Sequence, residues 1–221
     1  MRGLYAIVDL GALATANVDP MAFARAVLAA RPTALQVRAK EVPAREVLGL
    51  LRALVPACRA AGVMLVANDR ADVAALGGAD AVHLGQDDLP IELARSLSPR
   101  LKIGLSTHTP EQLARALEQR PDYVAYGPVF ATRSKENPDP VVGLEGLRVA
   151  SALARAARTP LVAIGGIELA NAPAVGALAD AAAVIGALVH GGLDGVTRRA
   201  LALGAALGGS GAEPAFAPAP A

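Results

Sequence analysis

The feature that most constrains this chain is a regular alternation of short apolar runs with segments of helical periodicity. Apolar, β-branched runs predict eight strands, at residues 3–8, 34–38, 63–68, 81–86, 102–106, 123–129, 161–165 and 182–188. Between them apolar residues recur at helical spacing, as in Val47, Leu51, Leu54 and Cys58. No block contains only strands or only helices. The pattern therefore favours a closed parallel sheet, and the predicted fold is α/β, a single (β/α)8 TIM barrel.

The length of 221 residues suits one domain with a well-buried core. We expect residues 1–207 to form the barrel, which would be the catalytic domain. Residues 208–221 contain mostly Gly, Ala and Pro and have little to bury. This composition predicts a disordered tail.

Composition excludes several classes of partner. Lys and Arg number 21 against 20 Asp and Glu, so no broad basic surface is expected for nucleic acid or an anionic membrane. The apolar run before Asp9 is too short for a signal peptide, and the apolar window 172–189 is interrupted by Asp180 and a proline. The single cysteine, Cys58, cannot form an internal disulfide and is expected to be a buried thiol. We therefore expect a cytoplasmic protein; its oligomeric state is not defined by the sequence, and a homo-oligomer is compatible with it.

The second predicted strand places polar residues where a barrel strand is normally covered on both sides. Gln36, Arg38 and Lys40 alternate with apolar residues and so share one face of the chain. Two cations are thereby directed at the barrel mouth. Because a buried, unpaired charge is costly, acidic neighbours or an anionic ligand must compensate.

Acidic residues follow the next two strands, at Asn68-Asp69 and at Gln86-Asp87-Asp88. Adjacent strands lie about 4.8 Å apart, so Asp69 and Asp88 could face one divalent ion. Magnesium commonly takes one or two carboxylates and completes its shell with water and substrate phosphate. The alternative is a salt-bridge cluster of Arg38 and Lys40 with these two aspartates.

Two further regions favour phosphate binding. The loop after the sixth strand offers Thr132, Arg133, Ser134 and Lys135, which supply hydroxyls and cations; an ordinary solvated loop is the alternative. Glycines follow the seventh strand at 165–166 and the eighth at Gly186. Barrels often bind phosphate there, although a tight turn would use glycine equally well.

The remaining candidates concern single polar residues. Ser106 ends the fifth strand, where barrel enzymes keep their chemistry, so it is a candidate for substrate contact. His83 lies within an apolar strand and is expected to be a hydrogen-bonded core residue, His108 to orient a loop, and His190 to be exposed. This scattered set favours neither a zinc site nor a Ser-His or Cys-His nucleophile. Thr109 and Gln112 predict a capping box at a helix start.

Six segments occur in one order along the chain: LQVRAK at 35–40, ANDRADVA at 67–74, VHLGQDDL at 82–89, GLSTHT at 104–109, GPVFATRSK at 127–135 with Gly143, and PLVAIGGI at 160–167. Over residues 3–205 the set resembles the thiamine phosphate synthase family. The resemblance implies a transferase of thiamine biosynthesis. It would join 4-amino-5-hydroxymethyl-2-methylpyrimidine diphosphate to 4-methyl-5-(2-hydroxyethyl)thiazole phosphate, releasing diphosphate and thiamine monophosphate with Mg²⁺.

The resemblance also implies roles for individual residues. The pyrimidine diphosphate would be held by Gln36, Arg38, Lys40, Asn68, Ser106 and Lys135, of which Arg38, Lys40, Ser106 and Lys135 would be catalytic. The thiazole phosphate would be bound by Thr132, Ser134, Gly166, Ile185 and Gly186, and Mg²⁺ by Asp69 and Asp88. Ser134 stands where the family often has Thr, and Gly186 where it often has Ser, which removes a side-chain donor.

Two other functions remain open at this stage. The related thiazole tautomerase, an isomerase, resembles the synthase and uses a His near the end of strand five, where His108 could serve. It commonly lacks the Asn-Asp and Gly-Gln-x-Asp features, which this chain keeps at 68–69 and 85–88. A non-catalytic phosphate-binding barrel is the other alternative; it would bind ligand without releasing diphosphate.

Overall fold

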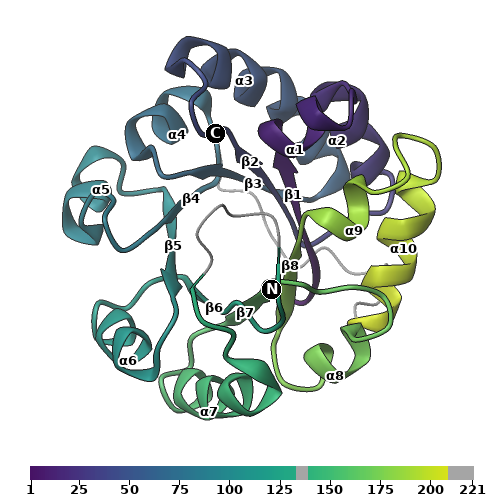
Figure 1. The fold of residues 1–221 in the computed structure, drawn as a ribbon. Helices are drawn as coiled ribbons and strands as arrows, with labels where there is room; N and C mark the ends of the chain where they lie inside the picture. The colour runs from purple at the N-terminus through teal and green to yellow at the C-terminus, as the bar shows by residue number, and fades with distance from the viewer. Residues whose placement is uncertain (133–138, 209–221) are drawn as a thin grey trace.

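The computed structural model describes residues 1–132 and 139–208. Within these residues the strands close into a parallel barrel, in which each strand pairs with its neighbours in sequence and β8 returns to pair with β1. Figure 1 shows the strands as an inner ring surrounded by helices. The predicted (β/α)8 barrel is confirmed. Apart from Gly208, the predicted tail lies outside the described residues.

The strands lie close to their predicted positions. They are β1 Gly3–Asp9, β2 Ala34–Arg38, β3 Met64–Asn68, β4 Ala81–Leu84, β5 Lys102–Thr107, β6 Tyr123–Tyr126, β7 Leu161–Ile164 and β8 Ala181–Val184. Four predicted strands, the fourth, sixth, seventh and eighth, extend beyond the observed carboxyl ends, and the sixth and eighth do so by most. β6 ends before the Gly127-Pro128 pair, and the end of the predicted eighth strand belongs instead to a short helix.

The helices occupy the segments between the strands. They are α1 Leu10–Thr15, α2 Pro20–Leu28, α3 Ala44–Ala61, α4 Ala71–Gly77, α5 Ile91–Leu97, α6 Pro110–Glu118, α7 Gly143–Ala156, α8 Ala172–Gly176, α9 Gly186–Val189 and α10 Val196–Ala206. Among the described residues, no helix combines the length and apolar composition needed to cross a bilayer.

Alternation along each strand builds two apolar layers. One set of side chains packs between strands and helices and includes Val8, Leu35 and Cys58, whose thiol is buried as predicted. The other set fills the barrel interior and includes Tyr5, Val66 and Tyr123. Because a parallel barrel is covered on both sides, both faces of a strand are apolar except near the cavity described below.

Three aspartates repeat one contact at the amino ends of the strands. Asp80, Asp122 and Asp180 each directly precede an even-numbered strand. Their carboxylates accept the N–H of Leu65, Ile103 and Leu161 at 2.8, 2.8 and 2.9 Å, respectively, on the preceding strand. Each bond ties a strand pair at the end of the barrel that is remote from the cavity described below.

The predicted cap of α6 forms, with one difference. Thr109 Oγ1 accepts the N–H of Gln112 at 3.2 Å, as in a capping box. The Gln112 side chain, however, accepts from the N–H of His108 at 2.7 Å rather than from the cap residue itself. The contact therefore also fixes the backbone of His108, a residue at the cavity.

Candidate active site

A cavity of about 840 Å³ opens at the carboxyl ends of the strands. Such a volume suits one or two small ligands. Eight of the predicted site residues line it, namely Gln36, Arg38, Asn68, Ser106, Thr132, Gly166, Ile185 and Gly186. Lys40, Asp69 and Asp88 are not among its lining residues. Ser134 and Lys135 lie outside the described residues.

Asp69 and Asp88 lie together beside the cavity. Burial is the main cause that raises the pKa of Asp69 to about 6; charge repulsion from Asp88 and a hydrogen bond with it add to the shift, while Lys40 and Arg38 oppose it. Asp88 Oδ2 accepts the N–H of Gly85 at 2.6 Å, which fixes that carboxylate. Two adjacent carboxylates that repel each other are suited to a divalent cation, since a cation removes the repulsion.

The backbone of Asp69 is itself unusual. Its φ is +63°, in the left-handed region that side chains other than Asn and Asp seldom adopt. Its N–H donates to the carbonyl of His83 at 2.8 Å, which ties the turn after β3 to β4. The turn thus directs the carboxylate toward Asp88 at some conformational cost.

Arg38 has a different partner from the one considered in the salt-bridge alternative. Its guanidinium pairs with Asp9, at the end of β1, whose side chain is only 7% exposed. Among the described residues, neither Arg38 nor Lys40 forms an ion pair with Asp69 or Asp88. The described residues therefore do not form the salt-bridge cluster that was the alternative to a metal site. The positive charges of Lys40 and Arg38 lower the pKa of Asp69 through space, and Arg38 lines the cavity.

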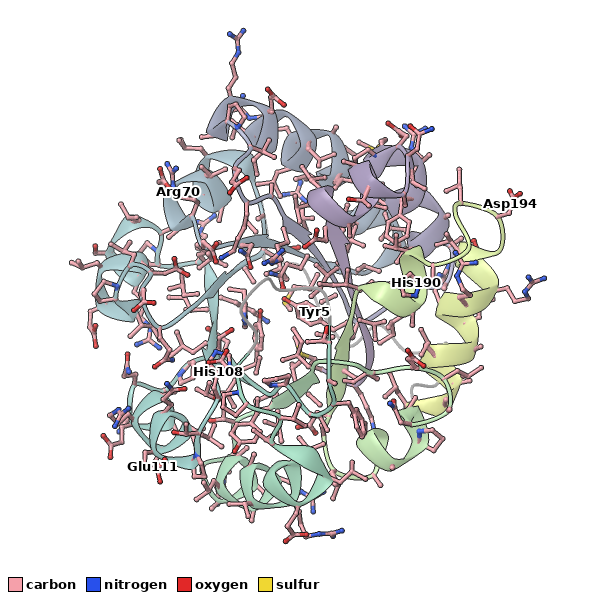
Figure 2. All side chains as sticks on the ribbon, in the orientation of Figure 1. Tyr5, Arg70, His108, Glu111, His190 and Asp194 are labelled. Atoms are coloured by element: carbon pink, nitrogen blue, oxygen red, sulfur yellow. The ribbon has the colours of Figure 1, made fainter. Side chains whose placement is uncertain are left out.

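A chain of buried hydrogen bonds crosses the floor of the cavity. Tyr5 Oη bonds to Gln36 Oε1 at 2.7 Å and to Tyr123 Oη at 2.9 Å. His83 then links Tyr123 Oη, 3.1 Å from its Nδ1, to Ser106 Oγ, 2.8 Å from its Nε2. The prediction that His83 is a hydrogen-bonded core residue is confirmed. Figure 2 shows Tyr5 near the centre of the barrel.

The glycines after β7 allow two segments of backbone to meet. Gly165 and Gly166 have φ of +100° and +61°, and a Cβ at either position would lie 2.4 Å from Pro128 or from the carbonyl of Ala131. The N–H of Phe130 in turn donates to the carbonyl of Gly165 at 3.0 Å. Only glycine fits this approach, so the segment that carries Thr132 is held against the end of β7.

The other two histidines lie at the rim (Figure 2). His108 Nδ1 donates to the carbonyl of Gly127 at 2.7 Å and lies 3.5 Å from Asp139 Oδ2, which supports a role in orienting the loop. His190 is exposed, as predicted, but it also lines the cavity beside Gly186. A Cβ at Gly186 would lie 3.5 Å from the imidazole, so a side chain has room there.

Reasoning from the sequence missed Asp9, Tyr5 and Tyr123 as site residues. The signal for the tyrosines was present, because Tyr5 shares the inward face of β1 with Ile7, and Tyr123 pairs in register with Gly104. A Cβ at Gly104 would lie 2.0 Å from the Tyr123 ring. A glycine beside a large inward-facing ring indicates that the ring lies across the barrel.

Comparisons with known proteins agree with one another. The family model described as thiamine monophosphate synthase matches residues 4–188. A thiamine-phosphate synthase of Anaeromyxobacter dehalogenans is 44% identical over 88% of this chain and 83% of its own length. Another from Koribacter versatilis is 47% identical over 84% of this chain and 88% of its own.

Solved structures extend the comparison. Thiamine phosphate pyrophosphorylase from Pyrococcus furiosus superimposes with a TM-score of 0.80 at 33% identity, over 93% of this chain and 95% of that one. A tryptophan synthase chain of Mycobacterium tuberculosis, at 17% identity and a TM-score of 0.65, covers 93% of each chain and shares the fold alone.

Proposed function

The chain belongs to the thiamine monophosphate synthase family, and from this premise we propose that it joins 4-amino-5-hydroxymethyl-2-methylpyrimidine diphosphate to 4-methyl-5-(2-hydroxyethyl)thiazole phosphate. The products are thiamine monophosphate and diphosphate. The observation that best supports this reaction is one cavity with Arg38 in its lining, glycine-rich loops at its other side, and the Asp69–Asp88 carboxylate pair close to Arg38. Two anionic reactants can thus be bound side by side.

The pyrimidine diphosphate is assigned to the side formed by β2, β3 and β5. Gln36, Asn68 and Ser106 bind the ring, while Arg38 and Lys40 bind the diphosphate, as cations bind phosphate oxygens. Lys135 is assigned to the same diphosphate from the resemblance; it lies outside the described residues. Lys40 is exposed, and Arg38 is paired with Asp9. Both lie close enough to Asp69 in the carboxylate pair to lower its pKa.

The thiazole phosphate is assigned to the side formed by the loops after β6, β7 and β8. Thr132 offers a hydroxyl, and the backbone at Gly166, Ile185 and Gly186 offers N–H groups. Ser134, from the family pattern, completes this group outside the described residues. This arrangement supports the approach of the thiazole nitrogen to the pyrimidine methylene carbon.

Asp69 and Asp88 are the residues that would hold Mg²⁺. Their mutual repulsion and the raised pKa of Asp69 fit a cation site. When bound, the ion neutralises charge on the departing diphosphate. Arg38, Lys40 and Lys135 supply fixed positive charge to the same group. The electron-rich aminopyrimidine then carries positive charge at its methylene carbon, which the thiazole nitrogen captures without a protein nucleophile. Cys58, a free buried thiol, is compatible with the reducing cytoplasm in which we place this reaction.

The decisive experiment incubates the protein with both substrates, with and without Mg²⁺, and measures thiamine monophosphate by mass and diphosphate by a coupled assay. We expect both products in equal amounts, with Mg²⁺ required. Ligand binding without diphosphate release would instead favour the non-catalytic barrel. Isomerisation of a thiazole phosphate in the absence of the pyrimidine would favour the tautomerase.

A further inference from the structure

The hydrogen-bond chain at the floor of the cavity has a direction, and Gln36 sets it. Its carbonyl Oε1 accepts from Tyr5 at 2.7 Å, and its Nε2 donates to Asn68 Oδ1 at 2.5 Å. A side-chain amide has one accepting end and one donating end, so with Nε2 of Gln36 donating to Asn68, the atom that faces Tyr5 is the accepting oxygen. The hydroxyl proton of Tyr5 is therefore committed to Gln36.

Each following bond is then determined. A phenol has one proton, so Tyr5 Oη must accept from Tyr123, whose own proton is thereby committed. Tyr123 Oη must in turn accept from His83 Nδ1. In a neutral imidazole with the proton on Nδ1, Nε2 is an acceptor. The proton of Ser106 is therefore directed at His83, which leaves the lone pairs of Ser106 Oγ to face the cavity.

We propose that Tyr5, Tyr123 and His83 are positioning residues that hold Ser106 Oγ as a hydrogen-bond acceptor, and that this acceptor selects a ring carrying an amino group over one carrying an oxo group. The inference rests on the proposed function, which places Ser106 against the aminopyrimidine. An exocyclic amino group donates to the acceptor. An oxo oxygen at the same position would face Ser106 Oγ, and since both atoms are acceptors, neither would have a hydrogen-bond donor. Polar sites reject near-identical substrates in this way.

The surroundings hold this chain in place. Burial is the main cause that raises the pKa of both Tyr5 and Tyr123 above the ordinary value for a phenol, so both keep their protons. The His83 ring lies nearly parallel to the Tyr123 ring, with an interplanar angle of 16° and centroids 5.5 Å apart. Gly104 leaves the space that the Tyr123 ring occupies. Reversal of the chain would need several buried groups to turn together.

The first test reads the proton position directly and needs no substrate. Nitrogen-15 NMR of histidine-labelled protein distinguishes a protonated ring nitrogen from an unprotonated one, and loss of signals in His83→Gln assigns the residue. We expect Nδ1 of His83 to be protonated and Nε2 unprotonated. A proton on Nε2, or on both nitrogens, overturns the proposed direction, whatever reaction the protein catalyses.

The second test measures selectivity. The 4-amino pyrimidine diphosphate and its 4-oxo analogue compete in the synthase reaction, in the parent and in Tyr123→Phe, which keeps the ring but removes the hydroxyl. We expect the parent to prefer the amino compound by about 10² or more, and the preference to fall about tenfold in the variant because Ser106 can then turn its proton toward the cavity. The KM for the thiazole phosphate should not change.

The matched control is Tyr126→Phe, the same change on the same strand at a buried ring that packs against the helices. Its preference should equal that of the parent. If Tyr123→Phe also keeps the parent's preference, the inference is wrong although the proposed function stands. If the parent forms no thiamine monophosphate, the proposed function is wrong, and the NMR result still decides the direction of the chain.

Discussion

Asp9 connects local structure and site chemistry through one side chain. Its Oδ1 accepts the N–H of Ala12 at 2.9 Å and so caps α1, while its other oxygen pairs with Arg38. One carboxylate thus begins a helix and holds a cation at the cavity. The sequence shows Asp9 only as the end of an apolar run, because its partner is on another strand.

Asp9→Asn should separate these two contacts, since asparagine can still cap the helix but cannot neutralise Arg38. We expect kcat/KM for the pyrimidine diphosphate to fall about tenfold, because Arg38 loses its fixed position. The free energy of unfolding should fall by about 2–3 kcal/mol, because the substitution leaves the charge of Arg38 partly buried and without its partner. Steady-state kinetics and urea unfolding measure both effects. The control is Asp19→Asn, where the carboxylate caps α2 through Ala22 at 2.7 Å; a similar loss there would remove the special role of Asp9.

Asp69 offers a comparison between two substitutions, because its left-handed backbone tolerates asparagine better than alanine. In EDTA, the urea midpoint of unfolding of Asp69→Asn should be no lower than that of the parent, since the substitution removes the charge repulsion with Asp88. Asp69→Ala should lose a further ~1–2 kcal/mol from backbone strain alone. Both should need about tenfold more Mg²⁺ for half-maximal rate. Mg²⁺ dependence identical to the parent's would argue against a ligand role.

At the scale of elements, the sequence predicted the order and type of the strands but not where every one ends. The run 182–188 is apolar throughout, yet β8 stops at Val184 and α9 begins at Gly186. Leu188 and Val189 are buried, but they belong to the helix α9 and not to a strand. Periodicity cannot separate a short buried strand from a short buried helix, since both are apolar on every side.

The site shows the same division between local and distant information. Residues at strand ends, such as Arg38 and Ser106, could be predicted because a parallel barrel brings all carboxyl ends to one mouth. Their partners could not, because Tyr5 and Tyr123 are 118 residues apart and meet only across the closed barrel. Sequence spacing identifies which face a residue is on, but register and ring size decide what it touches.

The cap of α6 gives a prediction at this scale. Thr109→Ala removes the acceptor for the Gln112 N–H and should destabilise the protein by about 1 kcal/mol. Thr15→Ala is the matched control, since the Thr15 hydroxyl donates to the carbonyl of Gly11 within α1 and caps no N–H. Its effect should be within about 0.5 kcal/mol. Urea unfolding of the two variants decides the point; equal losses would mean that the Thr109 contact is not a stabilising cap.

At the scale of the whole molecule, the two ends of the barrel have different tasks. At the amino ends, Asp80, Asp122 and Asp180 fasten strand pairs through backbone N–H groups. At the carboxyl ends, Asp69 and Asp88 oppose each other, with strained backbone at one of them. Stability is gained at one end, and the other keeps a repulsion that a ligand can relieve. Binding of a cation at Asp69 and Asp88 should therefore raise the free energy of unfolding of the whole protein.

This division predicts how pH changes the effect of Mg²⁺ on thermal unfolding. The pKa of Asp69 is raised from 3.8 to about 6, so the folded, metal-free protein holds a proton there that the unfolded chain releases near its ordinary pKa. That contribution to stability is complete below the unfolded value and is lost as pH rises through about 6. Mg²⁺ acts oppositely, because it binds the ionised carboxylate and must displace the proton at lower pH.

A Mg²⁺ concentration of about 100 times Kd should stabilise the protein by about 2.7 kcal/mol at about pH 7.5. Each pH unit below the pKa should weaken binding about tenfold, so at about pH 5 the stabilisation should fall to about half, roughly 1.4 kcal/mol. Thermal unfolding with MgCl₂ against NaCl of equal ionic strength measures this difference. In Asp69→Asn the Mg²⁺ effect should be smaller than in the parent at about pH 7.5 and nearly equal at the two pH values, because no proton competes with the metal at that side chain. An equal rise in Tm at both pH values in the parent would mean that Asp69 does not exchange its proton for the metal, and that the cation is held elsewhere.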